Sequence, residues 1–271
     1  MKVIPIMSTK GGVGKSRICA GLGRALRDRN LRVGFLDVDW VAPNLHIELG
    51  INKDPTLLLQ GGVGDIINPI ISPEGFPLIS SAFIFPPDQA ISMDEESKVH
   101  DIMEITSPGV VDWGDLDYLL MDTPPTTARF IHAALLIEDL YGVVLVAQPA
   151  SSSLADLLRT VSLLRDLQVP LLGLIGNQVY VTCSHGERLN LYDLGEGDLK
   201  AFSKSMGLTY LGSVPHVVPG VEAPILSGSM SVLVDMLLSQ KPEKLKVDSV
   251  SNIPYRLLLT LARRKSLAGK N

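Results

Sequence analysis

A glycine-rich loop near the amino terminus constrains the fold of this chain more than any other feature. It reads Lys10-Gly11-Gly12-Val13-Gly14-Lys15-Ser16, between an apolar run at Lys2–Met7 and a helical pattern at Lys15–Arg29. Small residues in such a loop let successive backbone N–H groups turn inward around phosphate oxygens, while a lysine reaches the β- and γ-phosphates and a hydroxyl binds Mg²⁺. Lys15 and Ser16 occupy those two positions. The order of strand, loop and helix therefore favours a phosphate-binding loop over a chance glycine-rich turn with two solvated lysines.

The loop departs from the general pattern G-x-x-x-x-G-K-[ST] at its start. Thr9 stands where that pattern has its first glycine, and Lys10 adds a second lysine ahead of Lys15. The resulting K-G-G-x-G-K-S form resembles the deviant Walker A loop of P-loop ATPases. We predict that it binds ATP through Lys10, Gly11, Gly12, Val13, Gly14, Lys15, Ser16 and Arg17.

Short apolar runs followed by turn residues and helical periods recur along the rest of the chain. Continuous apolar strands that alternate with helices are typical of a parallel sheet covered on both faces. We predict one doubly wound α/β domain over residues 1–271, with a mostly parallel sheet and an irregular, proline-rich insertion at about 51–108. The predicted strands are Lys2–Met7, Arg32–Asp37, Tyr118–Asp122, Gly142–Ala147, Leu171–Gly176 and Tyr210–Val214, and the predicted helices are Lys15–Arg29, Thr127–Leu135, Ser153–Leu167, Leu199–Met206 and Pro254–Lys265.

The composition limits the classes of function. The chain has 271 residues, 46% of them hydrophobic, and a net charge of -5 from 24 Lys and Arg against 29 Asp and Glu. That balance argues against a strongly basic nucleic-acid binder, so no nucleic-acid partner is expected. Two cysteines, Cys19 and Cys183, fit a reducing compartment, and no run approaches the roughly 20 apolar residues of a membrane span. We therefore predict a cytoplasmic protein.

Three carboxylates lie at or just after the ends of predicted strands, at the edge where a parallel α/β sheet binds ligands. Asp37 and Asp39 close the run F-L-D-V-D, and Asp122 closes an apolar run that a Thr-Pro-Pro turn follows. The position of Asp122 is that of a Walker B aspartate, which reaches Mg²⁺ directly or through water. A carboxylate after the second strand organises Mg²⁺-bound water or orients the attacking water. Taken alone, Asp37 is equally well explained as a turn or helix-cap residue.

Three segments together resemble the Mrp-type nucleotide-binding proteins, which belong with MinD, ParA and the nitrogenase iron protein among the deviant Walker A ATPases. The segments are K-G-G-V-G-K-S, L-D-V-D-W-V-A-P-N-L and V-D-W-G-D-L-D-Y-L-L-M-D-T-P-P. Further matches, in the same order along the chain, are Phe83–Asp88, Val169–Asn177 and Gly195–Asp198. The similarity covers nearly the whole chain.

The resemblance implies a homodimer that sandwiches two nucleotides and hydrolyses ATP to ADP and phosphate. It implies that Lys10 reaches the ATP phosphates of the partner subunit and that Pro215 flanks the base. Asn177 is then an adenine contact, unless it is only a turn residue at a strand end. The implied catalytic residues are Lys10, Lys15 and Asp39, and the implied Mg²⁺ ligands are Ser16, Asp39 and Asp122.

The members of this family resemble one another in carrying iron–sulfur clusters, held across the dimer by a C-x-x-C from each subunit. Four thiolates suit a four-iron cluster because each corner iron needs a fourth, soft ligand. Here Cys183 fits the first position, but Gly186 replaces the second cysteine. Either His185 completes the ligand set, as imidazoles do in Rieske centres, or Cys183 is a leftover loop cysteine.

The segment after Asp122 departs from the family pattern D-x-P-P-G-T-G-D as well. Thr126 replaces the glycine whose N–H approaches the γ-phosphate, and Arg129 replaces the acidic residue. We expect ATP binding to survive these changes, whereas the coupling of hydrolysis to conformational change is left open.

Two functions stay open at this stage. The first is an ATP-dependent iron–sulfur carrier of the Mrp type, or a degenerate relative, that hands clusters to apo-proteins with slow, partner-stimulated hydrolysis. The second is a MinD- or ParA-type positioning or regulatory ATPase that acts on a membrane or protein partner without a cluster. MinD-like proteins attach to membranes through a carboxy-terminal amphipathic helix, but for Pro254–Lys265 docking on the sheet is the favoured interpretation.

Overall fold

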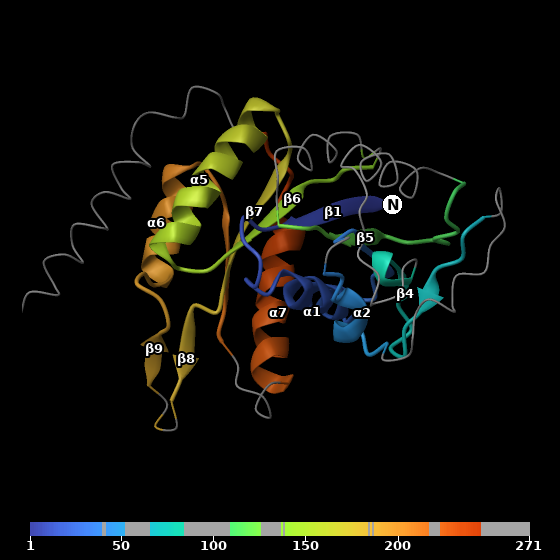
Figure 1. Cartoon of the computed structure of the whole chain (residues 1–271), viewed down its shortest axis with the longest axis horizontal. Coiled ribbons are helices and arrows are strands. Elements are labelled where there is room, and N and C mark those ends of the chain that lie inside the picture. Colours follow the sequence, from blue (N-terminus) through green and yellow to red (C-terminus); the bar gives the residue numbers. More distant parts are fainter. Residues whose placement is uncertain are drawn as a thin grey trace, which may run out of the picture. The chain divides into compact units, whose positions relative to one another are not determined.

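The structure, a computed structural model of the chain, describes residues 1–39, 42–51, 66–83, 109–125, 137, 139–183, 185, 187–216 and 223–244 (Figure 1). It divides into two compact units. Unit 1 comprises Met1–Met7 and Gly14–Tyr141, and unit 2 comprises Ser8–Val13 and Gly142–Asn271. The chain passes from unit 2 to unit 1 inside the glycine-rich loop, between Val13 and Gly14.

The strands of unit 1 lie in the order β1-β5-β2-β4-β3. All pairs are parallel except that of β3 with β4. Every residue of β2 and β5 is buried, which explains why both read as continuous apolar runs rather than alternating ones. The strands are β1 (Lys2–Met7), β2 (Val33–Asp37), β3 (Ile70–Ile71), β4 (Pro77–Ser80) and β5 (Tyr118–Asp122).

Helix α1 (Lys15–Arg27) packs against β1, β2 and β5, and the short α2 (Leu45–Glu48) packs against α1 and β4. A single 3-10 turn, η2 (Ser81–Phe83), follows β4. Helix α1 approaches the sheet closely at Gly23, where a Cβ would lie 2.1 Å from the ring of Phe35. The face of α1 turned to the sheet has the spacing of an amphipathic helix: Ile18, Leu22, Ala25 and Leu26 are buried.

The strands of unit 2 lie in the order β10-β7-β6, all parallel. They are β6 (Val143–Ala147), β7 (Leu171–Asn177) and β10 (Tyr210–Val214). Helix α5 (Ser151–Asp166) packs on β6, whereas α6 (Glu196–Ser205) packs on β7 and β10.

Helix α7 (Ala223–Ser239) also packs on β10 and β7. Its buried residues Met230, Leu233, Val234 and Leu237 follow the i, i+3, i+4, i+7 spacing of a helix face. The fit against β10 is tight, since a Cβ on Gly212 would lie 2.9 Å from Leu233.

A two-stranded antiparallel hairpin stands apart from the strands of unit 2. It consists of β8 (Tyr180–Thr182) and β9 (Arg188–Asn190), and Figure 1 shows it extending away from α5 and α6. The Arg188 guanidinium lies 4.4 Å from the centre of the Tyr180 ring, a cation–π contact across the hairpin. The name "β8–β9 hairpin" is used below for residues 180–190.

The predicted mostly parallel α/β fold is confirmed. The six predicted strands are all present within one residue at each end, as are three of the predicted helices to within three residues. Four features were not predicted from the sequence: α7, α2, the β8–β9 hairpin, and the pairing of β4 with β2.

Other predictions are tested only in part or not at all. Within the predicted insertion at about 51–108, the structure describes Ile51 and residues 66–83, which include β3, β4 and η2. The rest of the insertion lies outside the described residues, as do the helices predicted at Thr127–Leu135 and Pro254–Lys265. The single-domain organisation stays a prediction. Among the described helices, none has the length and apolarity needed to cross a membrane.

Candidate nucleotide and magnesium site

The glycine-rich loop takes a backbone path that only glycine adopts without strain. Gly12 has φ 75° and Gly14 has φ 82°, in the left-handed region that favours glycine. Gly14 is the N-cap of α1, and its carbonyl accepts the first helical hydrogen bond, from Ile18. The loop therefore delivers the amino terminus of α1, with its unpaired N–H groups and positive dipole end, directly after the glycines.

Lys15 makes the most buried ion pair among the described residues of unit 1. Its Nζ lies 2.7 Å from Asp122 Oδ1, and the two side chains are 8% and 1% exposed. The other carboxylate oxygen, Asp122 Oδ2, is buried without a hydrogen-bond partner. An unpartnered buried carboxylate oxygen is costly unless something else binds there, so this atom marks a place for a cation.

The register of the sheet brings a second carboxylate beside the first. Asp37 on β2 is the direct neighbour of Asp122 on β5, and both are buried. Burial, reinforced by the charge of Asp122, raises the pKa of Asp37 to about 8. Burial also raises the pKa of Asp122, an effect that the Lys15 ammonium opposes. Buried acids held this close together form a site that favours the binding of positive charge.

The contacts of Asp37 support the turn-and-cap explanation that the sequence analysis left open. Asp37 Oδ1 accepts a hydrogen bond from the N–H of Asp39, and Oδ2 accepts from the N–H of Leu45, the first residue of α2, and from the Ser80 hydroxyl. These bonds fix the chain after β2. Asp37 thereby places Asp39, which is 9% exposed and accepts a hydrogen bond from the N–H of Ala42.

Ser16 lies beside Asp122, to which its hydroxyl hydrogen-bonds. Unit 1 therefore contains three side chains with the hard oxygen donors that Mg²⁺ prefers: Ser16, Asp39 and Asp122. Nowhere in the described ranges do three His, Cys, Asp or Glu side chains converge into a group able to hold a metal alone. This donor set fits a magnesium ion that takes its remaining ligands from water and nucleotide phosphates.

Lys10, on the other side of the loop, lies in unit 2 and does not reach a buried site. Its Nζ is 3.5 Å from Asp156 Oδ2 on α5, and the two side chains are 37% and 39% exposed. Asp156 also lies 3.6 Å from Arg159 one turn later. The sequence analysis did not find Asp156, because a carboxylate on the polar side of a helix carries no signal of a special role.

Asn177 contacts the loop from the end of β7. It is buried, and its side-chain N–H donates to the carbonyl of Val13 at 2.7 Å. Pro215, after β10, is also buried. Gln178, which follows Asn177, has φ 56°, and its amide oxygen accepts hydrogen bonds from Gln148 and from the Tyr192 hydroxyl. This glutamine pair was not predicted; side-chain amides after two neighbouring parallel strands are the signal that was available.

The two cysteines lie in different environments. Cys183 follows β8 and is partly exposed, and its N–H donates to the carbonyl of Glu187. Cys19 on α1 is fully buried, and that burial raises the pKa of its thiol well above the usual range. Cys19 is therefore an apolar core residue, and Cys183 is the thiol with access to a reagent or metal.

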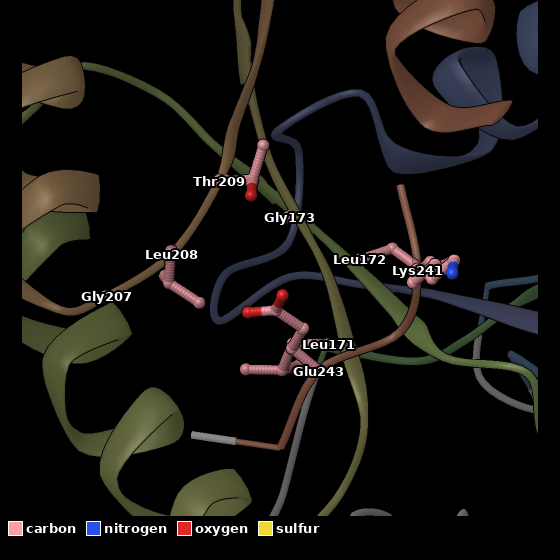
Figure 2. A pocket seen from close by; sticks show the side chains of 8 residues that line it. All are labelled: Leu171, Leu172, Gly173, Gly207, Leu208, Thr209, Lys241 and Glu243. Atoms are coloured by element: carbon pink, nitrogen blue, oxygen red, sulfur yellow. The ribbon is translucent and has the colours of Figure 1, made fainter. Parts of the chain in front are cut away.

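A small hollow in unit 2 lies at the opposite end of β7 from Asn177. It is lined by Leu171–Gly173, Gly207–Thr209, Lys241 and Glu243 (Figure 2). Its volume is about 10 Å³, which is room for one water molecule and not for a nucleotide or substrate.

Comparison with known proteins gives a consistent match. The NUBPL iron-transfer P-loop NTPase family, of the ParA group, matches residues 1–236. An iron-sulfur cluster carrier protein of Methanocaldococcus jannaschii is 32% identical over 244 residues, which cover 89% of this chain and 81% of the relative. An iron-sulfur cluster transfer protein NUBPL of Dictyostelium discoideum is 31% identical over 219 residues, 79% of this chain and 64% of the relative.

Solved structures support the fold at lower identity. A nucleotide-binding protein of Archaeoglobus fulgidus in complex with ADP has a TM-score of 0.63 at 22% identity, with 89% of each chain covered. The MinC:MinD cell division complex of Aquifex aeolicus has a TM-score of 0.61 at 21% identity, covering 91% of this chain and 98% of the other. The family match and the two relatives confirm the resemblance that the sequence motifs carry, and the solved structures confirm the fold.

Proposed function

The chain belongs to the NUBPL iron-transfer P-loop NTPase family, and on that basis we propose that it binds MgATP, hydrolyses it slowly as a homodimer, and carries iron–sulfur clusters to apo-proteins. The relatives named above are iron-sulfur cluster carrier or transfer proteins, which supports the choice of cargo. The two cysteines and the family support a cytoplasmic location.

The buried pair of Lys15 and Asp122 is the observation that carries the nucleotide part of the proposal. In the structure Lys15 neutralises Asp122 at 2.7 Å. When ATP binds, Lys15 turns to the β- and γ-phosphates, and Asp122 and Ser16 become available to hold Mg²⁺. The ion pair is thus replaced by two others, lysine with phosphate and carboxylate with magnesium, so no buried charge is left uncompensated.

Hydrolysis then depends on two residues outside that pair. Asp39, held in place by the hydrogen bonds of Asp37, positions the attacking water. Lys10 leaves Asp156 and reaches the phosphates of the nucleotide in the partner subunit, which makes hydrolysis dependent on dimerisation. Because each subunit completes the other's site, the reaction is slow in the monomer and is stimulated by partners that favour the dimer.

The cluster is the cargo, and Cys183 is the residue we propose as its ligand. Cys183 sits after β8 with a partly exposed thiol, and His185 follows two residues later. Two subunits would supply two thiolates, with the imidazoles as the remaining ligands. Both residue types bind iron, so the donor set fits a cluster with mixed sulfur and nitrogen ligation.

A second candidate function rests on one observation in the sequence. Gly186 stands where the family has its second cysteine, which halves the number of thiolates per dimer. A regulatory or positioning ATPase that acts on a protein or membrane partner requires no cluster, and it accounts for this loss directly.

Anaerobic reconstitution with iron and sulfide distinguishes the two candidates. We expect bound iron of about four atoms per dimer in the wild type, and loss of that iron in Cys183→Ala and in His185→Ala. Cys19→Ala is the matched control, because Cys19 is buried and should leave the iron content unchanged. Iron that does not depend on Cys183 would refute the carrier function and leave the nucleotide switch alone.

A further inference from the structure

Both ends of the β8–β9 hairpin are attached to elements of unit 2, β7 and α5, that carry a residue in contact with the phosphate loop. At its first end, Asn177 donates to the Val13 carbonyl, and Gln178 then turns the chain out of β7 with φ 56°. Two backbone bonds hold the start of the hairpin to the end of β10: the N–H of Val179 donates to the carbonyl of Val214, and that of His216 donates to the carbonyl of Tyr180.

The second end of the hairpin is attached through α5. Asp193, three residues after β9, accepts hydrogen bonds from both the N–H and the hydroxyl of Ser151, the first residue of α5. The N–H of Leu194 adds a bond to the carbonyl of Pro149. Asp156, five residues along the same helix and about 8 Å further along its axis, pairs with Lys10.

From these contacts we propose that the phosphate loop restrains the β8–β9 hairpin through two tethers, Val13–Asn177 and Lys10–Asp156–α5–Asp193, and that ATP releases the second. The inference rests on the proposed function, because it takes from it that Lys10 leaves Asp156 for a phosphate. Lys10 then has two alternative partners, the Asp156 carboxylate of its own subunit or a nucleotide phosphate. These two pairings are the two states between which ATP shifts the protein.

The expected effect on the hairpin is small but measurable. Lys10 and Asp156 are more than one-third exposed, and the pair spans 3.5 Å. Exposed pairs of this kind shift an equilibrium by up to about fivefold. The core contacts of α5, including the buried Leu154 and Leu157, stay in place and keep the effect within this range. In the ATP-bound protein the hairpin should open about two to five times more often, which makes the partly exposed Cys183 more accessible.

Hydrogen–deuterium exchange of residues 178–194 in the full-length protein tests the tether. In the wild type, MgATP should accelerate exchange of the hairpin amides about two- to fivefold. Asp156→Asn should show that faster exchange without nucleotide, and MgATP should accelerate it no further. Alkylation of Cys183 by iodoacetamide, followed by peptide mass, gives a second readout with the same expected order, because the buried Cys19 does not compete.

Two further variants act on the other side of the tether. Asp193→Asn and, more mildly, Ser151→Ala weaken the attachment of the hairpin to α5. Both should raise exchange without nucleotide and leave the ATP dissociation constant unchanged, because neither residue lies on the loop. Lys200→Gln is the matched control: it removes the exposed Lys200–Glu196 pair on α6, for which the described part of the chain shows no ion pair with the loop, and it should behave as the wild type.

The inference is wrong if the hairpin amides of Asp156→Asn exchange at a rate within about 1.5-fold of the nucleotide-free wild type. A ratio of 1.5 corresponds to about 0.2 kcal/mol. Slower exchange of the wild-type hairpin in MgATP contradicts the inference as well. If the wild type binds no ATP in calorimetry, the proposed function fails. The nucleotide-free comparison of Asp156→Asn with the wild type still shows whether the Lys10–Asp156 pair restrains the hairpin.

Discussion

Replacement of Asp122 by asparagine should destabilise the nucleotide-free protein strongly, although the side chain keeps its shape. Asp122 is 1% exposed and its Oδ1 lies 2.7 Å from Lys15 Nζ, whose side chain is 8% exposed. The substitution leaves the lysine ammonium buried without its counterion. Breaking a buried ion pair by removing one partner costs about 3–5 kcal/mol.

Two features of the site reduce that cost. The asparagine oxygen still accepts a hydrogen bond from Lys15, and the Asp37 carboxylate lies beside position 122 in the sheet register. We therefore expect the free energy of unfolding to fall by about 2–4 kcal/mol in Asp122→Asn. For a protein of this length that corresponds to a fall in the melting temperature of roughly 4–8 °C.

The assay is urea unfolding of four proteins without nucleotide: the wild type, Asp122→Asn, Lys15→Met and the double variant. Each single variant leaves one buried charge uncompensated, and the double variant leaves neither. The loss of unfolding free energy in the double variant should therefore be smaller than the sum of the two single losses, by about 1.5–3 kcal/mol. Losses that add to within about 0.5 kcal/mol would refute the pairing argument, because they would mean that Lys15 and Asp122 do not depend on each other.

The remaining expectations concern single contacts. Asn177→Ala removes the buried hydrogen bond to the Val13 carbonyl and should lower the free energy of unfolding by about 1–3 kcal/mol in urea titrations; a change below about 0.5 kcal/mol would contradict the assigned bond. Leu233→Ala, on the buried face of α7, should lower it by about 2–5 kcal/mol, while the same change at the exposed Leu238 should have little effect. The hydrogen bond from Arg24 holds the pKa of Glu74 below its usual range, so Glu74 adds stability above its unfolded-state pKa and loses it as the pH falls through the lower, folded value. The stability difference between the wild type and Glu74→Gln should therefore be largest at neutral pH, below about 1 kcal/mol for this partly exposed pair, and disappear in acid; an unchanged difference at pH 3 would contradict the pairing.

The strongest local patterns in the sequence allowed the most accurate predictions. β2 and β5 are buried on both faces, so their apolar runs leave no ambiguity with an amphipathic helix, and Asp122 closes β5 where it was predicted to. The phosphate loop was identifiable because the positive φ of Gly12 and Gly14 requires glycine at those positions.

Other elements have no comparable local pattern. Helix α7 is apolar on most sides, with the exposed Val232 and Met236 beside its buried face, so its periodicity is weak even though it packs well on β10. The strand β4 has four residues and becomes part of the sheet only through its pairing with β2, a contact between distant segments. Such pairings are set by tertiary structure, and propensity alone does not reveal them.

The site residues show the same division. Motif positions such as Lys15 and Asp122 stand out in the sequence, but the contacts of Asp37 and Asp156 are with residues far along the chain. Asp37 fixes α2 and the Ser80 hydroxyl, and Asp156 holds Lys10. A carboxylate carries no mark in the sequence of which distant group it will bind, so these two roles required the structure.

Under the proposed function, the charge arrangement in unit 1 also implies that magnesium and ATP favour each other's binding. Asp122 is neutralised by Lys15, and in the described residues no protein group alone is able to hold a metal. The unpartnered Oδ2 of Asp122 offers Mg²⁺ one buried ligand, but a cation bound there without nucleotide would lie beside the Lys15 ammonium, whose repulsion opposes it. Under the proposed function ATP would remove that obstacle, because its phosphates would accept Lys15 and supply further oxygen ligands for Mg²⁺. Magnesium and ATP should therefore stabilise the protein together far more than the sum of their separate effects, since each removes the energetic cost of binding the other.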